Sequence, residues 1–87
     1  MTEEPMSRRI TTKQAAEVAD EIGINFEAVG FDLDQFTRGM RVELEHGSRD
    51  PETDVTHDDP IVTGKIAWAH LKGLPDYYDR LAEMERD

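Results

Sequence analysis

The chain has 87 residues and no cysteine, and its 20 acidic side chains against 10 basic ones give a formal net charge of -10. This length allows one domain that buries roughly 60% of its unfolded surface. The absence of cysteine excludes disulfides and thiolate metal ligands. The acidic balance repels nucleic acid and anionic lipid, so we expect neither direct nucleic-acid binding nor membrane binding. No apolar run is long enough for a signal peptide or a membrane span, which predicts a cytoplasmic protein.

The N-terminal part of the chain divides into a tail and a first helix. Residues 1–10 carry charges, a proline and no apolar period, which predicts a disordered tail ahead of a helical domain over 11–87. A helix is predicted over 12–22, because apolar residues recur there at helical spacing. Thr11 and Gln14 form a capping box at its start, and Gly23 follows its end.

The stretch from Ala19 to Val29 has the spacing of the first half of a helix-turn-helix motif. A recognition helix here would read NFEAVGFDLD, which offers no arginine, lysine or glutamine to base edges. The spacing therefore favours a tight corner and a one-turn helix over 25–29, with Phe26 and Val29 packed into the core.

A second helix is predicted over 33–46, with Gly47 at its end. Its apolar residues form one stripe: Leu33, Phe36, Met40 and Leu44. Glu43 lies on the shoulder of this stripe and needs a polar partner. The acidic loop that follows resembles a calcium loop. However, Val55 replaces the turn glycine and Ile61 replaces the closing glutamate, so calcium binding is not predicted.

The segment over 59–72 is predicted to be the central helix. Asp59 and Pro60 are typical of a helix start, and the helix is apolar on nearly every side, with His70 pointing inward. A short turn then leads to a fourth helix over 75–85. The sequence thus predicts an all-α fold, a single small domain of three to four helices packed around a central apolar helix.

The titratable side chains near the core suggest two alternatives. Glu43 and His46 have the Glu-x-x-His spacing of carboxylate metal sites, and His70 with Asp58 could complete a divalent metal site. Alternatively, Glu43 and His70 form a polar core cluster, in which a hydrogen bond joins the second and third helices and no cofactor is needed.

An apolar surface is the other candidate site. Ile61 and Trp68 lie seven residues apart on one face of the third helix, at the edge of its polar strip. They either cover an edge of the core or form a surface that binds a partner.

Several strings that follow one another at short spacing resemble a family of small proteins of unknown function from bacteria and their phages. They are Gly39-Met40, VELEHG at 42–47, TDVTHDDPIVTGKIAWAHL at 53–71 and PDYYDRL at 75–81. The resemblance covers roughly residues 11–85. It implies a compact helical domain, and it implies no activity.

Three classes of function remain open. The sequence contains no nucleophile with a base at defined spacing, no phosphate-binding glycine loop and no cofactor signature. We therefore expect a small acidic binding or regulatory protein with a protein partner, and not an enzyme. The first alternative is a metal-binding protein that uses Glu43, His46 and His70. The second is an acidic nucleic-acid mimic that binds a basic protein.

Overall fold

The computed structural model describes residues 10–49, 51–52, 54 and 59–85. It contains four helices: α1 (Thr12–Ile22), α2 (Leu33–Arg49), α3 (Pro60–Gly73) and α4 (Tyr77–Met84). The described residues include no strand. The predicted all-helical single domain is therefore confirmed. In the same part of the chain, no helix is both long and apolar enough to cross a membrane.

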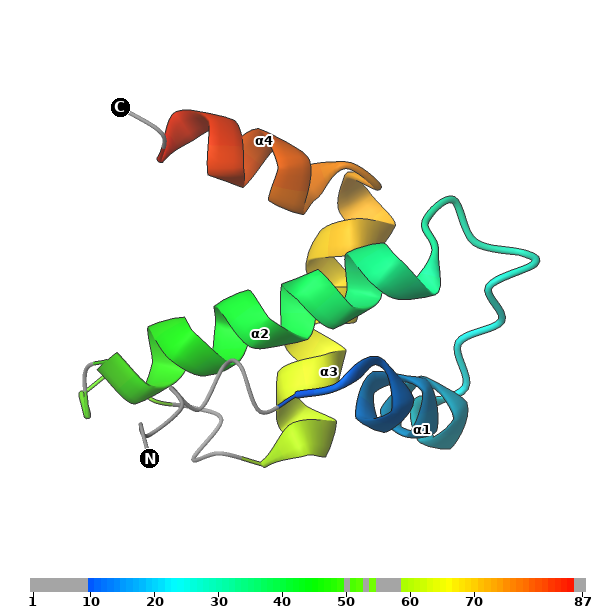
Figure 1. Ribbon diagram of the computed structural model, residues 1–87, viewed down its shortest axis with the longest axis horizontal. Coiled ribbons are helices and arrows are strands. Elements are labelled where there is room, and N and C mark those ends of the chain that lie inside the picture. The colour runs from blue at the N-terminus through cyan, green and yellow to red at the C-terminus, as the bar shows by residue number, and fades with distance from the viewer. Residues whose placement is uncertain (1–9, 50, 53, 55–58, 86–87) are drawn as a thin grey trace.

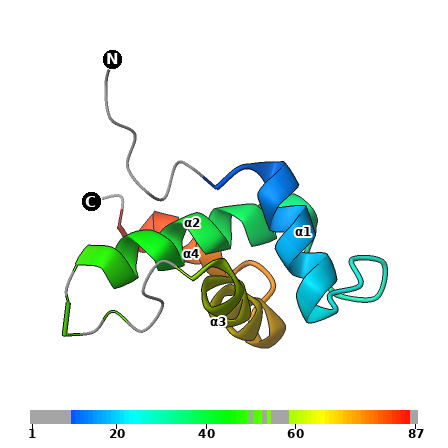
Figure 2. The same ribbon diagram turned by 90° about the horizontal axis from the view of Figure 1, so that it is seen from below.

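The helices α2 and α3 cross steeply at the centre of the domain, and α1 and α4 lie at opposite ends of this pair (Figures 1 and 2). As predicted, α3 packs against each of the other helices, but α2 does so too. The bulky core side chains of α2 are Phe36, Met40 and Leu44, whereas α3 contributes mainly small buried residues, Thr63, Gly64 and Ala67, with Leu71. Ala69, which the helical pattern placed inward, is exposed.

Local sequence signals define most helix ends. At α1 the Gln14 backbone N–H donates to Thr11 Oγ1 (3.1 Å) and the Thr11 N–H donates to Gln14 Oε1 (2.9 Å). Gly23 ends α1 with φ of 90°, a left-handed conformation that glycine adopts without strain. Asp59 caps α3 by accepting from the Ile61 N–H at 2.8 Å. These caps match the predicted helix starts and stops.

The end of α2 differs from the prediction, which placed it at Gly47. The helix continues through Gly47, which is buried, to Arg49. A glycine inside a helix costs about 1 kcal/mol relative to alanine, which packing against the rest of the protein can outweigh. The sequence signal was therefore overridden by tertiary contacts.

The connection between α1 and α2 forms the predicted corner without a helix of its own. The carbonyl of Asn25 accepts from the N–H groups of Ala28 (3.0 Å) and Val29 (3.1 Å), which makes an isolated turn. Phe26 packs on the core, where its ring meets those of Phe31 and Phe36 edge to face. The corner is thus held by aromatic contacts as well as by its backbone.

The folded domain begins before the predicted boundary at residue 11. Ile10 is a buried core residue, and its carbonyl accepts from Arg41 Nε of α2 at 2.8 Å. The other residues of the predicted tail, 1–9, lie outside the described part. Ile10 is an isolated apolar side chain outside any helical period, so the sequence pattern did not predict its burial. Its contact with α2 arises only in the folded protein.

Two glycines allow the helices to approach closely. A Cβ atom at Gly64 of α3 would lie 2.5 Å from Val18 Cγ1 of α1 and 3.3 Å from Phe36 Cζ of α2. A Cβ atom at Gly39 of α2 would lie 2.5 Å from the ring of Tyr78 of α4. These positions are where α1 and α4 pack onto the central pair.

We expect Gly64→Ala to lower the free energy of unfolding by about 1 to 2 kcal/mol. Overpacking against the buried, β-branched Val18 costs about 1 to 3 kcal/mol. This cost exceeds the helix-propensity gain of up to about 1 kcal/mol from replacing glycine by alanine. Chemical denaturation of the variant and the wild type measures the difference. Gly73→Ala is the matched control, because no atom lies within 4 Å of its added Cβ, and it should be neutral or slightly stabilising. Equal stability of Gly64→Ala and wild type would contradict this account of the packing.

Candidate functional site

A polar cluster joins α2, α3 and α4. Glu43 Oε2 accepts from Tyr78 Oη at 2.7 Å and lies 2.9 Å from His70 Nδ1, while Tyr78 Oη lies 3.2 Å from His70 Nδ1. The Glu43 side chain is only 12% exposed, and Tyr78 is almost fully buried. The two groups that the sequence pattern paired, Glu43 and His70, thus lie within hydrogen-bond distance, with Tyr78 as a third member.

The chemistry of the three groups sets the direction of each hydrogen bond. A carboxylate can only accept, so His70 donates from Nδ1. Burial, together with the hydrogen bond to Glu43, raises the pKa of the Tyr78 phenol well above its usual range, which keeps it a donor. Tyr77 stacks on the His70 ring with centroids 4.4 Å apart and an angle of 12°. The polar contacts at Nδ1 and the stacked ring of Tyr77 together fix the orientation of the His70 ring.

A second polar contact fastens α4 to α2 at the surface. Arg38 Nη1 donates to Asp79 Oδ1 at 2.5 Å, and Gln35 Nε2 donates to Asp79 Oδ2 at 3.1 Å. These hydrogen bonds lower the pKa of the Asp79 carboxyl. Because both groups are well exposed, the pair contributes little to stability compared with the buried cluster.

The predicted metal ligands are not gathered in the described part of the chain. His46 faces Glu85 beyond the end of α4, with Nε2 and Oε2 4.0 Å apart, and it is not a member of the Glu43–His70 cluster. Asp58 lies outside the described residues. Among the residues that are described, no group of three or more histidines and acids could hold a metal ion. The Glu-x-x-His spacing failed as a signal because its two side chains turn towards different partners.

The sequence pattern did not predict Tyr78 as a partner of Glu43. A usable signal was present in Gly39, which stands one helical turn before Glu43 and makes room for the aromatic ring. A buried tyrosine hydroxyl also needs a partner, and the carboxylate on the shoulder of α2 was a candidate. Only the position of α4 decides that they meet.

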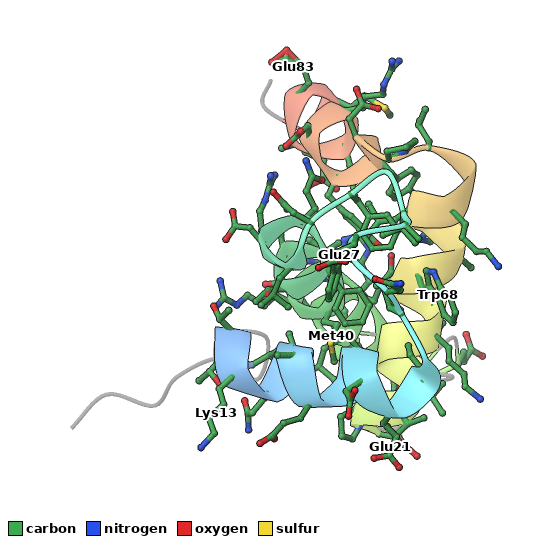
Figure 3. All side chains as sticks on the ribbon, turned by 90° about the vertical axis from the view of Figure 1, so that its right-hand side faces the viewer. Lys13, Glu21, Glu27, Met40, Trp68 and Glu83 are labelled. Carbon is green, nitrogen blue, oxygen red and sulfur yellow. The ribbon has the colours of Figure 1, made fainter. Side chains whose placement is uncertain are left out.

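The two residues of the predicted partner surface have different surroundings. Ile61 lines a pocket at the start of α3, whereas Trp68 is not among the residues around that pocket. Trp68 packs against the core, and Lys72 Nζ lies 4.9 Å from its ring centroid. The buried Nε1 of Trp68 has no hydrogen-bond partner among the described residues. Figure 3 shows Trp68 along the side of α3. The helical spacing placed the two residues on one face but did not place them in one site.

The pocket has a volume of about 350 Å³ and lies between α1, α2 and the start of α3. Its apolar wall is formed by Ile10, Val18, Met40, Leu44 and Ile61. Its polar wall comes from Gln14, Glu17 and Glu21 of α1 and from Thr63. Figure 3 shows Glu21 projecting from the last turn of α1, at the end that approaches the start of α3.

Two of the polar groups around the pocket are already hydrogen-bonded within the chain. Gln14 Oε1 accepts from the Thr11 N–H at 2.9 Å, and Thr63 Oγ1 donates to the Asp59 carbonyl at 2.8 Å. Small-molecule sites usually carry several convergent polar groups that orient the ligand. Among the polar groups that line this pocket, the carboxylates of Glu17 and Glu21 make no hydrogen bond or ion pair within the described part of the chain.

The fold and site together define a small all-helical domain with a polar cluster between its helices and an apolar pocket. The chain matches the family described as protein of unknown function (DUF5661) over residues 15–87, and it belongs to that family. The matched range includes Glu43, His70, Tyr78 and all pocket residues except Ile10 and Gln14. No curated protein and no solved structure matches the chain.

We expect Tyr78→Phe to lower the free energy of unfolding by about 1.5 to 3 kcal/mol, because it removes a buried hydrogen bond to a charged acceptor. Denaturant unfolding at neutral pH measures this loss. Tyr77→Phe is the matched control, since its hydroxyl makes no hydrogen bond in the described part and its ring still stacks on His70. Equal losses in the two variants would show that the hydroxyl of Tyr78 does not stabilise the fold.

The raised pKa of Tyr78 gives a pH dependence. A phenol whose folded-state pKa lies above its unfolded value of 10.0 stabilises the fold fully below that pH, and the stabilisation is lost as the pH rises beyond it. The sequence has two tyrosines, so Tyr78 is the only tyrosine in the variant Tyr77→Phe. Ultraviolet titration of this variant should show no phenolate until the protein unfolds. Phenolate formation near pH 10.0 with the helical circular dichroism intact would contradict the buried hydrogen bond.

Proposed function

We propose that this chain is a non-enzymatic binding module that receives an apolar anchor of a protein partner in the pocket between α1, α2 and α3. The observation that carries the proposal is the composition of the pocket. Six apolar residues line it, Pro60 at the start of α3 among them, while Gln14 Oε1 and Thr63 Oγ1 are used within the chain. A mainly apolar lining, with carboxylates as its free polar groups, suits a side chain of a partner better than a small polar substrate.

The polar cluster supports the same proposal from another direction. Glu43 accepts hydrogen bonds from two residues of other helices, so its role in joining α2, α3 and α4 accounts for its burial. The pocket uses other residues of α2, since Met40 and Leu44 line it together with residues of α1 and the start of α3. We therefore assign the cluster to stability and the pocket to binding.

The size of the pocket fits one or two anchoring side chains. Its 350 Å³ is at the lower end of the range of about 300 to 1,000 Å³ that is typical of ligand sites. A few well-packed anchors carry most of the binding energy in protein interfaces, so a pocket of this size is sufficient for a docking site. We also place the module in the cytoplasm, which the lack of cysteine favours.

An NMR titration with a neutral amphipathic helical peptide tests the proposal. The peptide carries leucines at helical spacing among alanine, glutamine and serine. Amide shifts should concentrate around Val18, Leu44 and Ile61, with a Kd in the range of ~0.1 to 1 mM, or about -4 to -5.5 kcal/mol. Shifts spread over the surface, or no shifts at all, would refute pocket binding.

Two variants of α3 serve as a matched pair in the same titration. Ile61→Asn removes an apolar wall of the pocket and should weaken binding at least tenfold. Lys65→Asn introduces the same residue one turn later, at an exposed position that does not line the pocket, and should leave the affinity unchanged. Circular dichroism of both variants checks that the helices remain folded. Equal affinities of the two variants would exclude Ile61 from the site.

A further inference from the structure

The rim of the pocket carries a pair of unneutralised carboxylates. Glu17 and Glu21 stand one helical turn apart on α1, and both are exposed. Within the described part of the chain, neither of them forms an ion pair or a side-chain hydrogen bond. Like charges at this spacing repel each other on a helix surface. Their charge is therefore available to a group that comes from outside the chain.

Among the described residues, no basic side chain lines the pocket. Arg41, which lies close to it, donates its Nε to the Ile10 carbonyl. Lys13 precedes Glu17 by one turn but forms no ion pair with it in the described part. The net charge of -10 adds a long-range field of the same sign. The rim and the whole surface thus attract cationic groups.

The pocket wall excludes most known modes of peptide recognition. The described residues contain no strand, so there is no sheet edge that an extended peptide could join. The described residues that line the pocket include no aromatic side chain, which recognition of polyproline segments requires, and no arginine cluster that could bind a phosphopeptide. Insertion of the apolar face of a helix into a groove remains.

We infer that the pocket binds a basic amphipathic helix of a partner protein, whose apolar side chains enter the pocket while flanking lysines or arginines contact Glu17 and Glu21. This inference rests on the proposed function and names the chemistry of the partner. A second copy of the chain is a poor occupant, because the whole molecule carries the same net charge of -10 and is repelled by the rim. The charge of the rim supplies orientation and partner selection, and the apolar wall supplies contact area.

Three helical peptides with identical leucine positions test the inference on the full chain. The positions that flank the leucines carry lysine in the first peptide, glutamine in the second and glutamate in the third. Calorimetry at low salt should rank the affinities in that order, with lysine over glutamine by about 2- to 30-fold for two exposed ion pairs. Raising the salt to about 0.5 M should remove most of this difference, because the Debye length becomes shorter than the range of the attraction.

The double variant Glu17→Gln/Glu21→Gln should abolish the preference for lysine while it still binds the glutamine peptide. Glu27→Gln/Asp34→Asn is the matched control, since it removes the same charge from exposed positions that do not line the pocket. It should keep the preference. If both double variants lose the preference equally, the net charge and not the rim selects the peptide, and the inference is overturned.

The remaining outcomes separate this inference from the proposed function. Equal binding of all three peptides at the pocket overturns the inference and leaves the proposed function standing, whereas binding of none refutes both. Tighter peptide binding by Arg8→Gln/Arg9→Gln would show that the chain's own basic pair competes for the rim, which also overturns the inference. If the amide shifts of Val18 and Ile61 change on dilution in the absence of peptide, a second copy of the chain occupies the pocket, and the inference is overturned.

Discussion

At Gly64 the backbone of α3 lies against side chains of α1 and α2, and the arrangement of the domain depends on this contact. Val18 and Phe36 occupy the space in which any other residue would place its Cβ. Because close-packed interiors do not yield by several tenths of an ångström without cost, this position fixes how near α1 lies to α3. Gly39 has the same role for α4, since the ring of Tyr78 lies against it. The helices α1 and α4 thus pack onto the central pair at two glycines, Gly64 and Gly39.

The polar cluster follows from the second of these contacts. With its ring against Gly39, Tyr78 places its hydroxyl at Glu43, one turn further along α2, and Glu43 also meets His70 of α3. Each of the three groups would be costly to bury alone, but together they satisfy one another. A small domain has a thin stability margin, so one such cluster that joins three helices is a substantial part of its specificity.

The pocket follows from the first contact. Val18 and Thr63 both line the pocket. Val18 of α1 lies against Gly64, and Thr63 is the neighbour of Gly64 in α3. The helix start at Pro60 and the anchoring of Ile10 by Arg41 complete the wall. The helix α1 packs its apolar face into the core and presents Glu17 and Glu21 at the rim of the pocket. This amphipathic helix therefore contributes both apolar lining and negative charge to the site.

The sequence by itself determined the helices and most of their caps, and it placed Glu43 on the shoulder of the apolar stripe of α2 and His70 on a core-facing side of α3, because these features depend on spacing within one helix. Only the tertiary structure decided that Tyr78 joins that pair, that His46 turns to Glu85, that α2 continues past Gly47 and that Ile61 and Trp68 belong to different surroundings. It also decided that Ile10 is part of the core. Periodicity states which face of a helix is buried, but which residue of another helix meets that face depends on how closely the backbones approach. That distance is set here by Gly39 and Gly64, whose contacts lie far away in the sequence.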